Sequence, residues 1–297
     1  MAQRLCFAPM TKLLEFSPAE LAALAQSDVA RALQEDVGPA DLTAALVPPG
    51  RRITARVLVR EPAVLCGQPW AEAVIRHCDP SAELRWQVAE GQACQADQVV
   101  LEVQGEARAL LTAERTALNF LQLLSAVATR TAQHVAAVQG TRARIVDTRK
   151  TLPGLRLAQK YAVRTGGGLN HRIGLYDAVL IKENHIAAAG GIRPVLAAAQ
   201  AVAAQAQFIE IEVETLAQLQ EALDAGARMV LLDNMDLPTL HEAVRLNAGR
   251  AVLEISGGVT LERLAELAAT GVDRISIGGL TKDVKATDFS MRFEDWA

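Results

Sequence analysis

The 297-residue sequence predicts an α/β protein in which a small α+β sheet domain precedes a parallel α/β barrel. Four strand-like runs begin at Gln207, Met229, Ala251 and Arg274, so that successive starts lie 22 or 23 residues apart. Amphipathic segments separate these runs, and the runs are almost continuously apolar, which is typical of parallel strands buried on both faces. Two further strand candidates lie upstream, at residues 143–147 and 177–182. About six such strand–helix units favour a barrel over an open sheet.

The first third of the chain has a different pattern. Short β-rich runs at residues 53–59, 84–88 and 98–103 are separated by turns rich in Gly, Pro and charged residues. Helical spacing of apolar residues begins behind Thr112, which has the side chain of a helix N-cap. We therefore predict a sheet domain over residues 1–111 and a barrel domain over residues 112–284, with residues 285–297 able to pack back on the sheet.

The segments between the repeated strands carry helix start and stop signals. Thr215 and Gln218 have the spacing of a capping box, and Gly226 stands where a helix C-cap is expected. Thr260 and Gly271 bracket residues 261–269 in the same way. Each repeated unit is therefore predicted to be a strand followed by a helix that returns the chain to the next strand.

Composition excludes several classes of protein. The longest apolar runs, such as residues 195–204, are well short of the roughly 20 residues that span a bilayer, and residues 1–16 lack the apolar block of a signal peptide. The net charge of -4 argues against general nucleic-acid binding. The cysteines form no C-x-x-C pair, so we expect them to be reduced and mostly structural. They are Cys6, Cys66, Cys78 and Cys94. We expect a cytoplasmic protein that binds neither membranes nor nucleic acid.

Polar residues or glycines end all six predicted strands. Loops at the C-terminal ends of parallel barrel strands converge on one mouth, where barrel enzymes place their chemistry. We therefore predict one shared site at these ends. They are residues 147–150, residues 182–184, Glu212, residues 233–234, residues 256–258 and residues 278–279.

Residues 148–176 form a basic segment without a single Asp or Glu, although the net charge of the chain is negative. Clustered cations repel one another unless an anion lies between them. Arg149, Lys150, His171 and Arg172 lie at a strand end or beside a run of glycines, and we predict that they bind such an anion. Three other cations, spaced four residues apart on a predicted helix, fit a solvated basic face as well as an anion site. They are Arg156, Lys160 and Arg164.

Two carboxylates, Glu212 and Asp233, end neighbouring predicted strands. Such a pair can stabilise a developing positive charge, accept hydrogen bonds from sugar hydroxyls, or bind Mg²⁺. Glu210 and Glu214 share the alternation of Glu212, so all three are expected to point the same way in a regular strand. Of the three, Glu212 lies nearest the strand end without entering the next helix cap.

The last two predicted strands end in glycine pairs, at residues 257–258 and 278–279. Barrels commonly hold a phosphate at this place on bare backbone N–H groups. Arg115 has a different setting, in the first turn of the helix predicted to follow Thr112, where the helix dipole disfavours a cation. Either Glu114 relieves this cost, or Arg115 reaches a bound anion across a subunit boundary.

Several runs are similar to the motifs of the quinolinate phosphoribosyltransferase family, also called nicotinate-nucleotide pyrophosphorylase (carboxylating). The similarity covers about residues 110–293 and is most specific in the long central run, whereas the first hundred residues match more in layout than in motif. The runs are LTAERTALNFLQLLSAVATRT, IVDTRKTLPGLRLAQKYAVRTGGGLNHRIGLYDAVLIKENHI, IEIEVET, VLLDN, EISGG and ISIGGLT.

The resemblance implies a sheet domain followed by an incomplete, seven-stranded TIM-like α/β barrel. It implies a homodimer, or a hexamer of such dimers, in which two subunits share each active site. The implied activity is decarboxylating transfer of a phosphoribosyl group from phosphoribosyl pyrophosphate to quinolinate, in NAD biosynthesis. Mg²⁺ is the implied cofactor, and no organic cofactor is expected.

The resemblance also implies roles for single residues. Arg115 is the arginine lent to the neighbouring subunit, and Glu212 and Asp233 serve the ribose hydroxyls and Mg²⁺. Lys150 and Lys182 lie near quinolinate and the sugar pyrophosphate, and complete a catalytic set with the two carboxylates. Arg149, His171 and Arg172 bind the substrate carboxylates. The other implied substrate-binding residues are Thr148, Ser256, Gly257, Gly258, Ile277, Gly278 and Gly279, the last standing where Ala or Ser is expected.

The sequence leaves rival functions open. A nicotinate phosphoribosyltransferase needs fewer cations, because its substrate has one carboxylate, and a paralogue from metal-transport operons shares the fold. Lys182 at a strand end suits a Schiff base in an aldolase-like lyase. A non-enzymatic anion-binding protein would not require the pair of Glu212 and Asp233.

Overall fold

The computed structural model describes residues 15–294, and these residues form two compact units. The parallel unit comprises residues 134–150 and 168–278, and the antiparallel unit comprises residues 15–133, 151–167 and 279–294. Predictions that concern residues 1–14, including Cys6 and most of the segment that lacks signal-peptide features, lie outside the described residues. The same holds for residues 295–297.

A four-stranded antiparallel sheet forms the centre of the antiparallel unit, in the order β12-β1-β5-β3. Its strands are β1 (Arg52–Val59), β3 (Glu83–Trp86), β5 (Val99–Glu106) and β12 (Phe289–Glu294). Alternate residues of β1 are buried, so one face of the sheet is covered. The C-terminal strand β12 pairs with β1 from Val59↔Phe289 to Thr54↔Glu294. Residues from the two ends of the chain therefore share one sheet.

Four helices accompany this sheet: α1 (Pro18–Asp36), α2 (Gln68–Cys78), α3 (Ala107–Ala137) and α4 (Arg156–Thr165). Trp70 of α2 is completely buried, donates from Nε1 to Asp28 Oδ2 of α1 at 3.0 Å, and packs against Tyr161 of α4. The core of this unit thus joins residues of three helices that are distant in sequence. The short elements are β2 (Ala63–Val64), β4 (Ala93–Cys94), α10 (Gly279–Lys282) and the 3-10 turn Ala44–Leu46.

The start of α3 differs from the prediction. The helix begins at Ala107, directly after β5, and not behind Thr112. The side chain of Glu106 accepts a hydrogen bond from the Ala109 backbone N–H at 2.8 Å, as an N-cap residue does. Arg115 therefore lies beyond the first turn of the helix, and the expected cost of a cation at the helix start does not apply. The predicted domain boundary at residue 111 falls inside α3.

Six parallel strands form the sheet of the parallel unit, in the order β6-β11-β10-β9-β8-β7. They are β6 (Arg144–Val146), β7 (Val179–Ile181), β8 (Ile209–Val213), β9 (Met229–Asp233), β10 (Val252–Ser256) and β11 (Arg274–Ser276). An isolated parallel bridge joins Val146 of β6 to Leu169. Strands β8 to β11 begin within two residues of the predicted starts. The predicted mixed α/β fold, with a small sheet domain and a parallel-strand domain, is confirmed.

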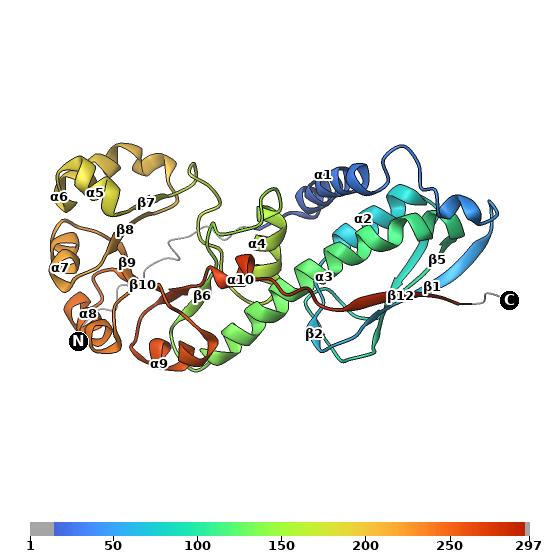
Figure 1. The fold of residues 1–297 in the computed structure, drawn as a ribbon. Coiled ribbons are helices and arrows are strands. Elements are labelled where there is room, and N and C mark those ends of the chain that lie inside the picture. Colours follow the sequence, from blue (N-terminus) through green and yellow to red (C-terminus); the bar gives the residue numbers. More distant parts are fainter. Residues whose placement is uncertain (1–14, 295–297) are drawn as a thin grey trace. The chain divides into compact units, whose positions relative to one another are not determined.

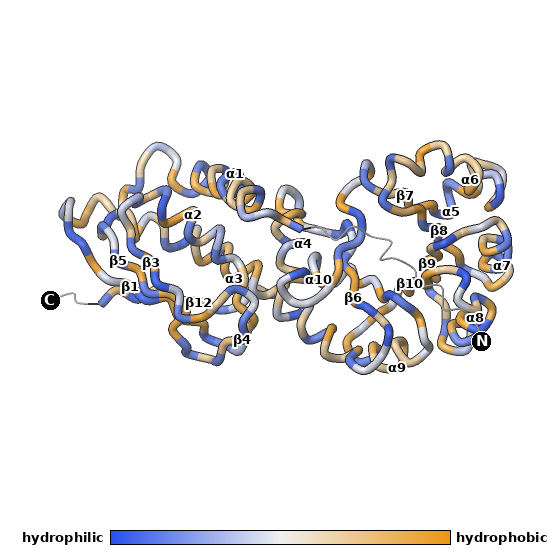
Figure 2. The backbone as a smooth tube through the Cα atoms, turned by 180° about the vertical axis from the view of Figure 1, so that it is seen from behind, coloured by the Kyte–Doolittle hydropathy of each residue, from blue (hydrophilic) through white to orange (hydrophobic). Residues whose placement is uncertain are grey.

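Helices follow the strands and lie around the sheet (Figure 1). They are α5 (Glu183–Ala189), α6 (Ile192–Ala199), α7 (Leu216–Asp224), α8 (Leu237–Asn247) and α9 (Leu264–Ala269), with 3-10 turns at Gln200–Gln205 and Leu261–Arg263. The predicted capping box of Thr215 and Gln218 is present at the start of α7. The apolar residues of β9 are buried, and Figure 2 shows the hydropathy of this strand and its neighbours along the backbone.

No single helix among residues 15–294 is long and apolar enough to cross a membrane. Two helical segments, Glu183–Ala189 and Ile192–Gln205, are together long and apolar enough, but the chain bends by 95° at the break between them.

Candidate active site

The register of the parallel sheet places polar residues of four strands on one face. Glu212 of β8 pairs with Leu231 of β9, which pairs with Glu254 of β10, which in turn pairs with Arg274 of β11. Alternate residues of a strand share a face, so Asp233 points to the same side as Leu231. The face that carries these residues surrounds a pocket.

The pocket has a volume of about 310 Å³ and lies entirely within the parallel unit. Eight of the predicted site residues line it: Thr148, Arg149, Lys150, His171, Arg172, Lys182, Glu212 and Ser256. The other lining residues are Leu180, Leu231, Glu254 and Ser276. The structure thus gathers five of the predicted cations and one of the predicted carboxylates around a single cavity.

Two of the predicted glycines are fitted closely to their neighbours. A Cβ on Gly278 would lie 2.8 Å from Lys150 Cδ, so this glycine lets the lysine pass along the backbone. Gly257 has φ +90°, and a Cβ there would lie 2.0 Å from Asn234 Oδ1. The backbone of Gly257 therefore requires glycine, whereas at position 278 a side chain would displace only the flexible side chain of Lys150. Gly278 therefore lies directly beside Lys150, and Gly257 lies directly beside Asn234.

The remaining predicted residues occupy other positions. Gly258 follows Gly257 with φ +58°, and Ile277 is buried after β11. Gly279 is the first residue of α10, and Arg115 lies in α3, so both belong to the antiparallel unit.

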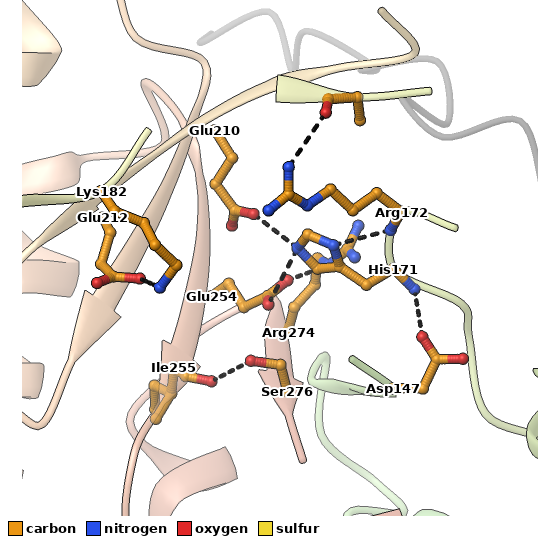
Figure 3. Close-up of polar contacts among 11 residues, drawn as sticks. Asp147, His171, Arg172, Lys182, Glu210, Glu212, Glu254, Ile255, Arg274 and Ser276 are labelled. Atoms are coloured by element: carbon orange, nitrogen blue, oxygen red, sulfur yellow. Dashed lines mark hydrogen bonds and ion pairs between the residues drawn. The ribbon is translucent and has the colours of Figure 1, made fainter. Parts of the chain in front are cut away.

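Lys182 and Glu212 form an ion pair at the rim of the pocket. Lys182 Nζ lies 2.5 Å from Glu212 Oε2, and the two side chains come from the ends of adjacent strands (Figure 3). Asp233 has its pKa raised, first by burial and then by the negative charge of Glu212, while Lys182 and Lys150 partly oppose this shift. The two carboxylates are therefore close enough to repel each other. A bound cation, or positive charge that develops on a substrate, would reduce this repulsion between Glu212 and Asp233.

Arg149 and Arg172 form the cationic side of the pocket. Burial lowers the pKa of Arg172, and the nearby guanidinium of Arg149 lowers it further. Arg172 Nη1 donates a hydrogen bond to the Ala178 carbonyl at 3.4 Å. Two partly buried guanidinium groups in one cavity repel each other, and an anion between them would relieve this cost.

Beneath these residues lies a buried charged cluster of His171, Glu210, Glu254 and Arg274, shown in Figure 3. His171 Nε2 is 2.8 Å from Glu210 Oε2, and Arg274 Nε is 2.7 Å from Glu254 Oε2. Burial raises the pKa of Glu210, and the Glu254 charge raises it further. Burial lowers the pKa of His171, but the two glutamates outweigh it and the net shift is upward.

Of this cluster, only His171 was predicted as a site residue, and Glu210 was expected to point the same way as Glu212 but was not chosen. Glu210 shares the alternation of Glu212 along β8, and Glu254 precedes Ser256 by two residues on β10, so the period of a strand was the available signal. His171, Glu210 and Glu254 each offer a ligand atom within 4.8 Å of the others, a spacing that suits a metal ion. The guanidinium of Arg274, however, already supplies positive charge to Glu254.

The middle of the basic segment, which forms α4, does not line the pocket. Arg156, Lys160 and Arg164 lie on α4 in the antiparallel unit, and Lys160 is completely buried. A solvated basic face is therefore wrong for Lys160. Spacing of four residues established a common helix face, but not that the face is buried.

Models of the quinolinate phosphoribosyl transferase N-terminal and C-terminal domains match residues 41–125 and 127–292. The chain belongs to the quinolinate phosphoribosyltransferase family. The nicotinate-nucleotide pyrophosphorylase (carboxylating) of Mycobacterium leprae is 43% identical over 274 residues, which cover 90% of this chain and 96% of that protein. Quinolinate phosphoribosyltransferase (decarboxylating) 1 of Nicotiana glauca is 39% identical, over 89% of this chain and 80% of that protein.

A solved structure gives the same family. The nicotinate-nucleotide pyrophosphorylase from Francisella tularensis matches with a TM-score of 0.91 at 41% identity, and the match covers 96% of this chain and 100% of that chain. These relatives do not favour a Schiff-base lyase based on Lys182, a nicotinate phosphoribosyltransferase or a metal-transport paralogue. The family resemblance that the sequence motifs indicated is therefore confirmed over most of the chain.

Proposed function

We propose that the chain transfers the phosphoribosyl group of phosphoribosyl pyrophosphate to the nitrogen of quinolinate, in NAD biosynthesis. The bond between the ribose and pyrophosphate breaks, the bond between the ribose and the pyridine nitrogen forms, and pyrophosphate leaves. The alkylated ring then accepts the electron pair of the adjacent carboxylate bond, so that carbon dioxide departs and a proton takes its place. The products are nicotinate mononucleotide, pyrophosphate and carbon dioxide.

One observation carries this proposal: cations from the basic segment line a single pocket together with Glu212 of β8, and Asp233 ends the neighbouring strand β9. Arg149 and Arg172 supply guanidinium groups for the substrate carboxylates, and Lys150 lies beside the glycine at the end of β11. Glu212 lines this pocket, Asp233 ends the next strand close enough to feel the charge of Glu212, and the two carboxylates would stabilise positive charge on the ribose ring. The arrangement holds both reactants in one cavity and aims one at the other.

Glu212 and Asp233 are also the residues that we propose to hold Mg²⁺. They fit the ion because two mutually repelling carboxylates lie at neighbouring strand ends, and Mg²⁺ commonly takes one or two carboxylates together with substrate phosphates. When bound, the ion would neutralise charge on the departing pyrophosphate. Lys182, now paired with Glu212, would share that task. No organic cofactor is required for this chemistry.

The finer points of the family resemblance are also proposals for this chain. Counting the Val146–Leu169 bridge as a seventh strand supports an incomplete seven-stranded barrel. We propose that Arg115 acts in the site of a neighbouring subunit, in a homodimer or a hexamer of dimers. We further propose that the protein is cytoplasmic. Ser256, Gly257, Gly258, Ile277, Gly278 and Gly279 would hold the phosphate, with Thr148 beside Lys150.

The purified protein tests this function with quinolinate, phosphoribosyl pyrophosphate and Mg²⁺. We expect nicotinate mononucleotide and carbon dioxide in equal amounts. Nicotinate in place of quinolinate is the matched control, and it should turn over poorly because it offers the cations one carboxylate. Turnover of nicotinate without turnover of quinolinate would move the assignment to a nicotinate phosphoribosyltransferase. Borohydride trapping of a carbonyl substrate on Lys182 would support the lyase instead.

A further inference from the structure

The loop that carries Arg172 is held from two sides by buried aspartates. Asp147, at the end of β6, accepts hydrogen bonds from His171 N at 2.8 Å and from Asn170 Nδ2 at 2.6 Å. Asp177 accepts from the backbone N–H groups of the two residues after Arg172, both at 2.8 Å. Arg172 is thus the residue between two fixed points of the backbone.

The ring of His171 holds the backbone of Arg172 itself. His171 Nδ1 accepts a hydrogen bond from the Arg172 backbone N–H at 2.8 Å. A nitrogen that accepts carries no proton, so the ring proton lies on Nε2 and is donated to Glu210 Oε2 at 2.8 Å. The residue is only 7% exposed, and its ring packs edge-on against Phe208. Both ring nitrogens of His171 are therefore engaged within the protein.

Glu210 is itself held in place by burial and by its neighbours. Its side chain is completely buried on β8, and the equally buried Glu254 lies on the same face of the sheet. Arg274 forms an ion pair with Glu254 and so balances one of the two negative charges. A carboxylate in this position cannot turn toward solvent, and this keeps its hydrogen bond to His171 fixed.

We propose that Glu210 is a positioning residue: through the His171 ring it fixes the backbone of Arg172, whose guanidinium then meets the dicarboxylate substrate. The identity of that substrate rests on the proposed function. The proposal adds a role to the one that the family resemblance implies for His171: its ring also orients the neighbouring arginine.

Calorimetric titration of quinolinate, together with steady-state kinetics, tests the role of Glu210. Glu210→Ala should weaken quinolinate binding and raise its KM by about ten- to a hundredfold, the range expected for losing a hydrogen bond to a charged group. The KM of phosphoribosyl pyrophosphate should stay within about threefold, because the sugar is held elsewhere in the pocket. A general loosening of the fold would raise both KM values, and that result would overturn the proposal.

Two further variants make the test sharper. Glu210→Gln keeps an oxygen that accepts from His171 Nε2, so it should restore quinolinate binding to within about threefold of wild type. Glu210→Gln also keeps the proposal testable if Glu210→Ala does not fold. A Gln variant that folds but loses quinolinate binding would contradict the proposal. Glu214→Ala is the matched control, since this exposed residue follows the same strand and has no part in the cluster.

Nitrogen NMR of the histidine rings tests the network without any turnover. The His171 signal, assigned by its loss in His171→Gln, should report an unprotonated Nδ1 and a protonated Nε2 in the free protein. A protonated Nδ1 could not accept a hydrogen bond from the Arg172 backbone N–H, and that result would overturn the proposal. If wild-type protein binds no quinolinate, the proposed function fails, and the ring state of the free protein still decides whether Glu210 and His171 form this network.

Discussion

The two units differ in how their buried carboxylates are hydrogen-bonded. In the antiparallel unit, the buried carboxylate of Asp79 accepts three hydrogen bonds, from Ser81 N, from Ser81 Oγ and from Glu106 N. In the parallel unit, Glu210 Oε1 and both oxygens of Glu254 accept no hydrogen bond among the described residues, although Glu254 meets Arg274 at ion-pair distance. Buried charge is costly unless its bonding capacity is used. The comparison indicates that the structural carboxylate of Asp79 has its hydrogen bonds supplied by its neighbours. The carboxylates below the pocket keep oxygens that accept no hydrogen bond among the described residues.

Removing Arg172 is expected to have the largest effect on function. Arg172→Ala should lower kcat/KM for quinolinate by roughly thirtyfold or more, because losing one partner of a partly buried charge pair costs about 2 to 5 kcal/mol. Steady-state kinetics measure the loss, and thermal melting checks the fold. Arg245→Ala is the matched control: this exposed arginine pairs with Glu242 on α8, and its removal should change neither property appreciably. Wild-type kinetics in the Arg172→Ala variant would contradict the proposed role of Arg172 in binding the substrate carboxylates.

Removal of Mg²⁺ is expected to come next. A chelator should abolish turnover, and added Mg²⁺ should restore it, because the ion would neutralise pyrophosphate charge that the lysines of the pocket would balance only in part. Asp233→Asn should raise the Mg²⁺ concentration needed for half-maximal rate by roughly tenfold or more, since it removes one oxygen charge from the site. Activity titrations against Mg²⁺ measure this. Full activity in excess chelator would contradict the proposed use of Glu212 and Asp233.

Asp79 tests the other half of the comparison. Asp79→Asn should lower the free energy of unfolding by about 1 to 3 kcal/mol, because it disturbs a saturated buried acceptor. Hydrogen bonds from Ser81 and from the Glu106 backbone lower the pKa of Asp79, so its contribution is present above the unfolded pKa of 3.8 and is lost as pH falls through the folded pKa. Denaturant unfolding at neutral and acidic pH measures both effects. Kinetics should be unchanged, and a large rise in KM would show that this unit's carboxylates also serve the reaction.

The smallest expected effect is a gain in stability. Burial and Glu212 raise the pKa of Asp233 in the folded protein, so ionising it costs stability at pH values above the unfolded pKa. Asp233→Asn should therefore melt slightly higher than wild type at neutral pH, and the difference should vanish as pH falls below that pKa. Thermal melting across this pH range measures it. A variant that melts lower at neutral pH would mean that Asp233 stabilises the fold.

Sequence patterns were sufficient for the parallel strands and for most of the pocket. The regular spacing of β8 to β11 and the polar residues at their ends follow from local composition, and parallel strands bring such ends together. Thus Arg149, Lys182 and Glu212 could be placed near one another from the order of residues alone. These predictions depend on period and order, which a single sequence contains.

Three features could not be obtained in this way. The start of α3 was missed because Glu106 replaces the usual N-cap residues and β5 leads into the helix without a turn. The burial of Lys160 depends on what packs against α4, which helix spacing does not reveal. Glu254 and Arg274 meet only through the register of β10 with β11, and their apolar sequence surroundings gave no hint of a charged pair.

A crystal structure with quinolinate, Mg²⁺ and an unreactive analogue of phosphoribosyl pyrophosphate tests the central claim most directly. We predict that the pyridine carboxylates contact the guanidinium groups of Arg149 and Arg172, and that the ribose lies beside Glu212 and Asp233 in the pocket of the parallel unit. Density for both reactants outside this pocket, or carboxylates that touch neither arginine, would contradict the account.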